Sequence, residues 1–221
     1  MDAASWTTEL DLGTPAGQML QKLASILPPE RPFQITVFGS APLQIGVERN
    51  LLSNDVDLFS DAEDLEGFVR EARMLQGQAD YYIQVCSGLN FRTSPLWGTR
   101  TREVKIKNTT FIFPHPIDIL IAKLNRLEEK DLEAFRVVRR KTGHPTEQEL
   151  IRELQFAVDL FRPGFDEENA ADLTNNTHRL WPLLYGRAID VRAEIIAPAL
   201  AKRRAGYGLP VRDYKRELRE G

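Results

Sequence analysis

The segment Phe33–Phe59, FQITVFGSAPLQIGVERNLLSNDVDLF, decides the fold that we expect for this chain. It opens with an apolar run, Ile35–Phe38, whose β-branched and aromatic residues favour a buried strand. That run ends at Gly39-Ser40. The segment closes with Asp55–Phe59, in which acidic and apolar residues alternate as they do in a strand with one face in a core.

The acid pair of the second strand predicts a metal site. Residues i and i+2 of a strand point to the same side, so the carboxylates of Asp55 and Asp57 face one way. Two carboxylates at that separation repel each other unless a cation lies between them. Mg²⁺ suits such oxygen ligands, and it is usually held by one or two carboxylates together with substrate phosphates. We therefore expect Asp55 and Asp57 to bind Mg²⁺ or Mn²⁺.

Gly39 and Ser40 predict a phosphate site beside this metal. Gly39 has no Cβ, so a phosphate can approach the backbone there. If the residues after Ser40 begin a helix, their N–H groups form a site for an anion. A phosphate site followed by a metal-binding acid pair indicates a nucleoside triphosphate bound with Mg²⁺.

With these motifs the chain resembles the nucleotidyltransferase superfamily. Its signature is a hydrophobic strand ending in Gly-Ser or Gly-Gly, a spacer, and Asp-hydrophobic-Asp on the next strand. Here fourteen residues separate Ser40 from Asp55, which is slightly long for the common version. The resemblance implies Gly39 and Ser40 at the phosphates and Asp55 and Asp57 as catalytic metal ligands. It also implies transfer of a nucleoside monophosphate from a Mg²⁺–NTP to a hydroxyl of an RNA, a protein or a small molecule.

The stretch His115–Glu133 is the second informative part of the sequence. Lys123, Leu127 and Asp131 fall at i, i+4 and i+8, so on one continuous helix Lys123 and Asp131 share a face. The stretch resembles a helix in bacterial nucleotidyltransferase-like families, including the toxins of AbiEii-type abortive-infection systems. That resemblance implies Lys123 as a nucleotide-binding residue, Asp131 as a further catalytic carboxylate, and an antitoxin as a partner.

A third acid, which many active nucleotidyltransferases use to activate the attacking hydroxyl, is not assigned. Gln84 occupies the place where the strand 81–86 would carry it. Glu103 is a candidate on a later strand, although a solvated edge strand explains it as well. Asp118 fits the local pattern, but Pro116 before it favours the first turn of a helix.

Each motif also has a purely structural interpretation. Gly-Ser after a strand is an ordinary turn, and Asp-x-Asp can be a solvated strand end. Lys123 and Asp131 can belong to a solvated helix with salt bridges and an acid at a helix N-terminus. The missing third acid favours a catalytically inactive member of the fold that serves as a binding or regulatory module. A glycosyltransferase with a metal-binding Asp-x-Asp is a further alternative, although the Gly-Ser turn so close upstream counts against it.

The pattern of the whole chain predicts an α/β fold, with a small mixed sheet at 1–115 and a helical region at 116–221. A possible capping box, Ser60–Glu63, marks a helix that we expect to run through Leu75, and Thr146–Glu149 marks another. The remaining elements that we expect are helices at 16–27, 117–127, 131–140, 146–161 and most of 166–204, a strand at 81–86, and a hairpin at 102–107 and 110–113.

Composition narrows the class of protein further. The 221 residues are 42% apolar, and the net charge of −3 argues against general nucleic-acid binding. The single cysteine, Cys86, excludes an internal disulfide and a cysteine-based zinc site. Acidic residues stand where a signal peptide needs basic ones, and no run of eighteen apolar residues occurs. We therefore expect a cytoplasmic protein with no membrane span.

Overall fold

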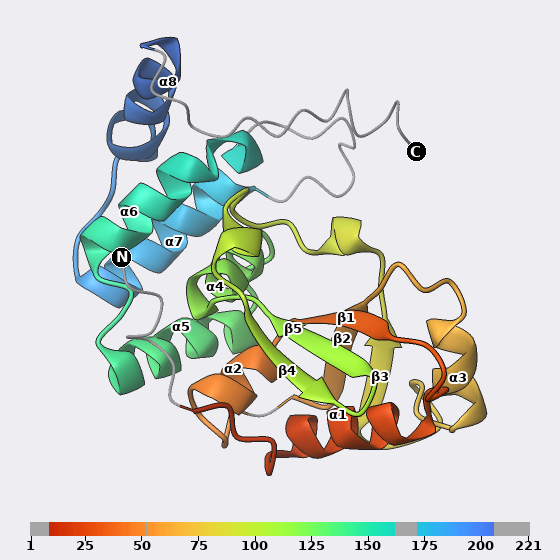
Figure 1. Cartoon of the computed structure of the whole chain (residues 1–221). Helices are drawn as coiled ribbons and strands as arrows, with labels where there is room; N and C mark the ends of the chain where they lie inside the picture. The colour runs from red at the N-terminus through yellow and green to blue at the C-terminus, as the bar shows by residue number, and fades with distance from the viewer. Residues whose placement is uncertain (1–8, 52, 162–171, 206–221) are drawn as a thin grey trace.

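The computed structural model of the chain describes residues 9–51, 53–161 and 172–205. At its centre is a mixed sheet of five strands in the order β3-β2-β1-β5-β4 (Figure 1). This confirms the predicted α/β fold with a small mixed sheet. The strands are β1 (Phe33–Phe38), β2 (Asp55–Phe59), β3 (Tyr82–Val85), β4 (Arg102–Ile106) and β5 (Thr109–Phe113).

The helices fall into two groups around this sheet. In Figure 1 α1 lies beneath the sheet and α3 beside it, whereas α4 to α8 lie beyond one end of it. The helices are α1 (Pro15–Ile26), α2 (Ala41–Gly46), α3 (Leu65–Glu71), α4 (Pro116–Leu124), α5 (Glu129–Thr142), α6 (Glu147–Phe156), α7 (Leu173–Tyr185) and α8 (Ala197–Arg204). Short 3₁₀ turns lie at Gly88–Asn90, Trp97–Thr99 and Val158–Phe161, and a π-helical turn lies at Arg192–Ile196.

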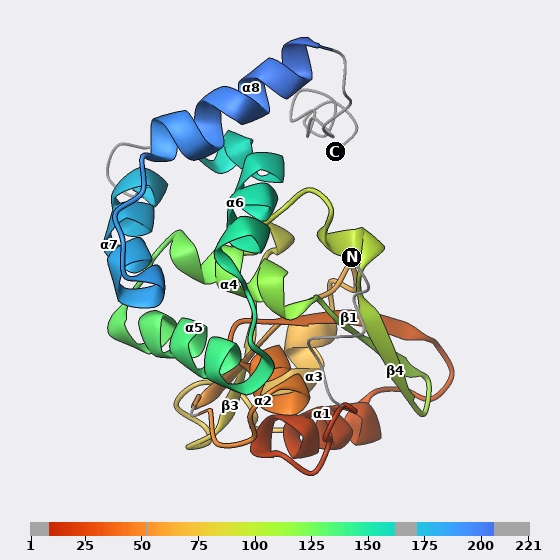
Figure 2. The same cartoon turned by 90° about the vertical axis from the view of Figure 1, so that its left-hand side faces the viewer.

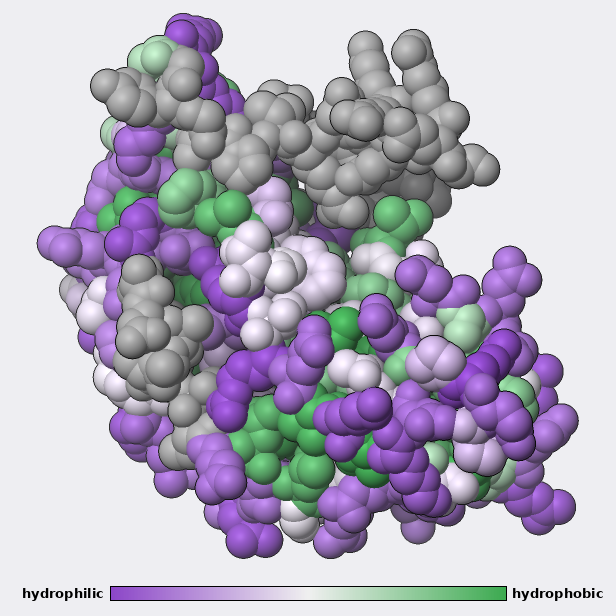
Figure 3. Space-filling view, in the orientation of Figure 1, coloured by the Kyte–Doolittle hydropathy of each residue, from purple (hydrophilic) through white to green (hydrophobic). Residues whose placement is uncertain are grey.

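Two apolar clusters hold the molecule together. The first packs α1 against the sheet and includes Leu20, Ile35 and Val56, all fully buried. The second fills the helical region, yet it also contains Phe38 from the end of β1 and Leu43 from α2. The helices after residue 115 therefore pack directly onto the end of the sheet, as the turned view in Figure 2 also shows. On the face seen in Figure 3, hydrophilic residues predominate, and hydrophobic ones gather where β4 and α1 lie.

The helix after β2 differs from its prediction. It begins at Leu65 with Asp64 as its N-cap and ends at Glu71, so the predicted capping box at Ser60–Glu63 is wrong. Ser60 Oγ is used elsewhere: it donates to the carbonyl oxygen of Gln34 and accepts from the N–H of Ala62. The chain cannot continue helically to Leu75 because Arg73 has a left-handed φ of 55°.

The connection between α4 and α5 corrects a second prediction. Lys123 and Asp131 do not lie on one continuous helix, because α4 ends at Leu124 and Leu127 adopts a left-handed φ of 49°. A new helix then starts with a capping box formed by Glu128 and Asp131. The capping box predicted at Thr146–Glu149 is confirmed. The helix predicted over 166–204 is divided into α7, the π-helical turn and α8, and residues 166–171 lie outside the described part of the chain.

Candidate functional site

The two carboxylates predicted as metal ligands lie where β1 ends. Asp57 is the register partner of Phe38, the last residue of β1, in the antiparallel pair of β1 with β2. Val56 is fully buried, whereas Asp55 and Asp57 are partly exposed, so both acids face the side opposite Val56. Ser53 Oγ donates to Asp55 Oδ1 at 2.6 Å, which orients that carboxylate.

Gly39 is required by Asp57 as well as by backbone geometry. Its φ is +67°, a left-handed conformation that residues with a Cβ rarely adopt. A Cβ built on Gly39 would lie only 2.0 Å from Asp57 Oδ2. Gly39 therefore leaves the space that the Asp57 carboxylate occupies, a reason for glycine that the sequence alone did not indicate.

Ser40 is the N-cap residue of the short helix α2, so the condition set for an anion site is met, and Pro42 stands in the first turn. The anion site expected at its start is limited, because Pro42 has no N–H and the N–H groups of Leu43 and Gln44 donate to the Ser40 carbonyl oxygen. The side chain of Ser40 has another partner: its Oγ accepts a hydrogen bond from Lys123 Nζ at 2.9 Å. A lysine ammonium thus stands at the point where the sequence predicts a phosphate.

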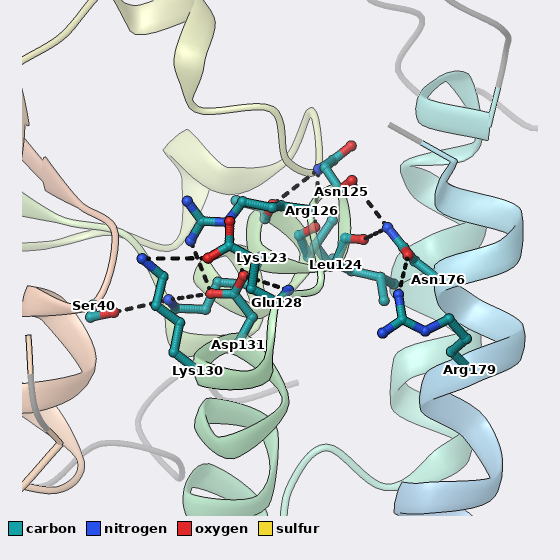
Figure 4. A network of polar contacts seen from close by, with 12 residues as sticks. Ser40, Lys123, Leu124, Asn125, Arg126, Glu128, Lys130, Asp131, Asn176 and Arg179 are labelled. Atoms are coloured by element: carbon teal, nitrogen blue, oxygen red, sulfur yellow. Dashed lines mark hydrogen bonds and ion pairs between the residues drawn. The ribbon is translucent and has the colours of Figure 1, made fainter. Parts of the chain in front are cut away.

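Lys123 and Asp131 are brought together by the bend between α4 and α5 (Figure 4). Lys123 Nζ donates to Asp131 Oδ1 at 3.0 Å, and the Asp131 side chain is fully buried. Arg126 also donates to Asp131, with Nε 3.1 Å from Oδ2 and Nη2 3.2 Å from Oδ1. The N–H of Glu128 completes the set at 3.1 Å from Oδ2.

This environment gives Asp131 a supporting place in the site. Burial alone would raise the pKa of Asp131, but the hydrogen bonds from Arg126 and Lys123 outweigh it and hold the pKa below its usual value. Asp131 is not among the described residues that line the two cavities at this site. It faces the two cations, and they in turn face the cavities.

Two adjoining cavities meet at this point. The acid cavity, of about 550 Å³, contains the acid pair and is also lined by Ser40, Ser53, Asn54, Tyr82, Gln84, Cys86 and Lys130. The amide cavity, of about 560 Å³, lies against α4 and α7 and is lined by Phe91, Arg92, Ile119, Ala122, Asn125, Asp172 and Asn176. Their common wall consists of Phe38, Gly39, Asp57, Asn90, Lys123 and Arg126.

The charge of the acid pair is not balanced by the protein alone. Burial, and then the neighbouring charge of Asp55, raises the pKa of Asp57 to about 6, although Lys123, Arg126 and Lys130 act in the opposite direction. A divalent cation between the two carboxylates would remove their repulsion. Over residues 9–51, 53–161 and 172–205, no group of three or more His, Cys, Asp or Glu side chains could hold a metal. A pair of carboxylates fits Mg²⁺ that takes its other ligands from phosphate and water.

The third acid is absent from the described part of this site. Gln84 is the register partner of Asp57 in the parallel pair of β2 with β3, and it lines the acid cavity. Glu103 lies on β4, which β5 and β1 separate from β2. Asp118 is in the first turn of α4, where Arg100 donates to it at 2.6 and 2.7 Å. Neither acid reaches the pair on β2.

Two cations of the site were not singled out from the sequence. Arg126 lies in the common wall, and Lys130 lines the acid cavity. Arg126 follows Lys123 by three residues, and residues at this spacing are neighbours on a helix surface. This spacing could have indicated that Arg126 belongs to the site. Lys130 carries no such signal, because the chain bends between Lys123 and Lys130.

No protein-family model, no curated protein and no solved structure matches this chain. The relation to the nucleotidyltransferase superfamily therefore stays a prediction from its motifs. Within the three described ranges, no helix combines the length and the apolar character that crossing a membrane requires.

Replacing Gly39 with alanine is expected to disturb both the backbone and the acid pair. The left-handed φ should cost about 1–2 kcal/mol in the free energy of unfolding, and the new Cβ should displace the Asp57 carboxylate. Urea denaturation and Mn²⁺ titration measure the two effects. Gly77→Ala is the matched control, since Gly77 also has a positive φ of 79° but nothing within 4 Å of a built Cβ. Unchanged Mn²⁺ affinity in a folded Gly39→Ala protein would refute this role of Gly39.

Replacing Asp57 with asparagine is expected to stabilise the metal-free protein at neutral pH. The folded-state pKa of Asp57 is raised to about 6, so the folded protein favours the protonated carboxyl. The stability that this protonated group contributes is fully present below about pH 4 and is lost as the pH rises through 6. Asp57→Asn should therefore raise the free energy of unfolding by about 1–2 kcal/mol at pH 7.5 in EDTA, and by almost nothing at pH 4. Asp61→Asn, at an exposed position, is the control. An equal effect of Asp57→Asn at both pH values contradicts the argument.

Proposed function

We propose that this chain binds a Mg²⁺–nucleoside triphosphate and transfers its nucleoside monophosphate to a hydroxyl acceptor on an RNA, a protein or a small molecule. The observation that carries the proposal is the meeting of the acid pair with Lys123 and Arg126 across the common wall. A metal-bound triphosphate needs both kinds of group side by side, carboxylates for the metal and cations for the phosphate oxygens. The alternation of Asp55 and Asp57 on β2 supplies the first, and the end of α4 supplies the second.

The side chains have distinct roles in this reaction. Asp55 and Asp57 would hold Mg²⁺ or Mn²⁺, which supplies neutralisation of charge at the phosphates. Lys123 donates to a phosphate oxygen from its place beside Ser40, and Arg126 and Lys130 extend the positive wall along the triphosphate. The acceptor oxygen forms a bond to the α-phosphorus and gives its proton to water, while the bond from the α-phosphorus to the oxygen that bridges it to the β-phosphorus breaks and pyrophosphate leaves. Positioning and charge neutralisation account for most of the catalysis in such a transfer.

We assign Asp131 a positioning role rather than that of a general base. Both of its oxygens accept hydrogen bonds from Lys123 and Arg126, and its side chain is fully buried. A carboxylate with a lowered pKa and no free oxygen is a poor proton acceptor, but it fixes the direction of two phosphate-binding cations. A toxin-type enzyme with an antitoxin partner in the cytoplasm is a narrower form of the proposal, and it rests on the resemblance alone.

A second candidate is a nucleotide-binding module that catalyses no transfer. It is favoured by Gln84, which stands beside Asp57 in the register of β2 and β3. The neutral amide of Gln84 supplies no negative charge to a metal ion, and it does not accept the proton of an attacking hydroxyl. The same nucleotide site would then sense a nucleoside triphosphate without consuming it.

Nucleotide binding is the first test of the site. NTP affinity should depend on Mg²⁺ or Mn²⁺, and Asp57→Asn should abolish that dependence. Lys123→Met should weaken NTP binding more than tenfold, a loss of about 1.4 kcal/mol or more, while Mn²⁺ still binds the acid pair. Lys105→Met, an exposed change on β4, should bind as wild type does. A folded wild-type chain that binds no NTP with either metal rejects the site, and a screen of radiolabelled NTPs against RNA and protein acceptors tests transfer.

Gln84→Glu separates the enzyme from the binding module. The new carboxylate would lie beside Asp57 and should increase divalent-metal affinity by about tenfold, because a third anion then surrounds the ion. If the wild type binds NTP without transferring it, gain of transfer in Gln84→Glu would assign the lost activity to this position. Gln34→Glu, on an exposed position of β1, controls for added charge. If the wild type transfers nucleotide faster than Gln84→Glu does, the chain is an enzyme and the nucleotide-binding module without transfer is excluded.

A further inference from the structure

Asn125, just after α4, lines the amide cavity and has a buried side-chain oxygen that no hydrogen bond from the described residues uses. Its Nδ2 donates to the carbonyl oxygens of Arg92 at 2.8 Å, Ile121 at 3.2 Å and Ala122 at 3.2 Å. These bonds fix the orientation of the amide, because an oxygen at that place would face three other oxygens. Asn125 Oδ1 is buried and has no hydrogen-bond partner among the described residues. In Figure 4 no dashed line reaches this oxygen.

Asn176, on α7, is oriented in the same way. Its Nδ2 donates to the carbonyl oxygens of Leu124 at 3.0 Å and Asn125 at 3.1 Å (Figure 4). Its Oδ1 accepts a long hydrogen bond of 3.4 Å from Arg179 Nη1. Asp172, at the start of α7, adds a carboxylate to the lining of the amide cavity. Beside α7 the lining of the amide cavity is therefore rich in acceptors, whereas Arg92, Lys123 and Arg126 supply donors elsewhere in it. The part of a ligand that lies beside Asn125 and Asn176 must carry donors.

The chain order relates these acceptors to the proposed phosphate site. Asn125 directly precedes Arg126, which lies in the common wall with Lys123. The sugar is the part of a nucleotide next to its phosphates, and its hydroxyls are the donors nearest to them. Apolar side chains of Phe91 and Ile119 line the same cavity and suit a base. A volume of about 560 Å³ is within the range of small-ligand sites, roughly 300–1,000 Å³.

We infer that the amide cavity receives the nucleoside, and that Asn125 Oδ1 accepts a hydrogen bond from a ribose hydroxyl. The site would then select ribonucleotides over deoxyribonucleotides. This inference rests on the proposed function, because the triphosphate between Lys123 and Arg126 brings the sugar to Asn125. An unpaired buried acceptor is unfavourable, and a ligand hydroxyl satisfies it.

Affinities of the full chain for a series of ligands test the inference. With Mg²⁺, ATP should bind about tenfold more tightly than 2′-deoxy-ATP or 3′-deoxy-ATP, whichever lacks the donating hydroxyl. Equal affinity for all three overturns it. Equal affinity for ATP and both deoxy analogues, together with weaker binding of the 6-oxo analogue ITP, would give the acceptor to a base amino group and also overturns it. Inorganic tripolyphosphate is the reference for the phosphate site alone.

The tripolyphosphate measurement separates two failures. If tripolyphosphate binds with Mg²⁺ and the ribose and deoxyribose forms bind alike, the inference about Asn125 fails and the phosphate site stands. If neither tripolyphosphate nor any nucleotide binds, the proposed function fails, and the inference that depends on it fails too.

A substitution of Asn125 supplies independent evidence. Asn125→Ala should weaken ATP binding by about tenfold. It should leave the affinities for tripolyphosphate and for the deoxy analogue that lacks the donating hydroxyl nearly unchanged, so that the ratio of the two nucleotide affinities falls to about one. Asn50→Ala, at an exposed position that lines neither cavity, is the matched control and should keep the wild-type ratio. A preserved ratio in folded Asn125→Ala overturns the assignment. If this variant does not fold, the ligand series with the wild type decides.

Discussion

The site depends on one ion cluster, in which the buried carboxylate of Asp131 holds the buried Lys123 and the half-exposed Arg126. The cluster joins three elements, since Lys123 also reaches Ser40 at the start of α2, and Asp131 opens α5. A charge taken out of water is costly unless it is paired, and removing one member of a buried pair typically costs about 3–5 kcal/mol. The helical region is thereby held against the end of the sheet, and its cations face the acid pair.

The sheet imposes the second constraint. Because Phe38 pairs with Asp57, the chain leaves β1 directly beside a carboxylate, and only a residue without a Cβ fits there. The left-handed turn at Gly39 then directs Ser40 and α2 toward α4. The motif thus works as one unit, in which the glycine, the serine and the second acid depend on one another for space and direction.

Local patterns were sufficient to predict much of this arrangement. The alternation of Asp55–Phe59 predicted β2 and the shared direction of its acids, and Thr146–Glu149 predicted a cap, because both depend on neighbouring residues only. Lys123 and Asp131 were predicted to share one face of a continuous helix, two turns apart, yet they are in contact across a bend at Leu127 that tertiary packing stabilises. Gln84 was identified from the sequence as the residue in the place of a third acid, but its register opposite Asp57 was not predicted, since strand order and register are not local properties.

The common wall of the two cavities has a thermodynamic consequence. Asp57 and Lys123 belong to both cavities, so under the proposed function a cation in one and a nucleotide in the other would share the same side chains. Two ligands that share contacts have a coupling free energy, and coupling is reciprocal. If a bound divalent ion multiplies the affinity for the nucleotide by some factor, the bound nucleotide multiplies the affinity for the ion by the same factor. Under the proposed function, the affinity of the site for each ligand would therefore depend on the concentration of the other.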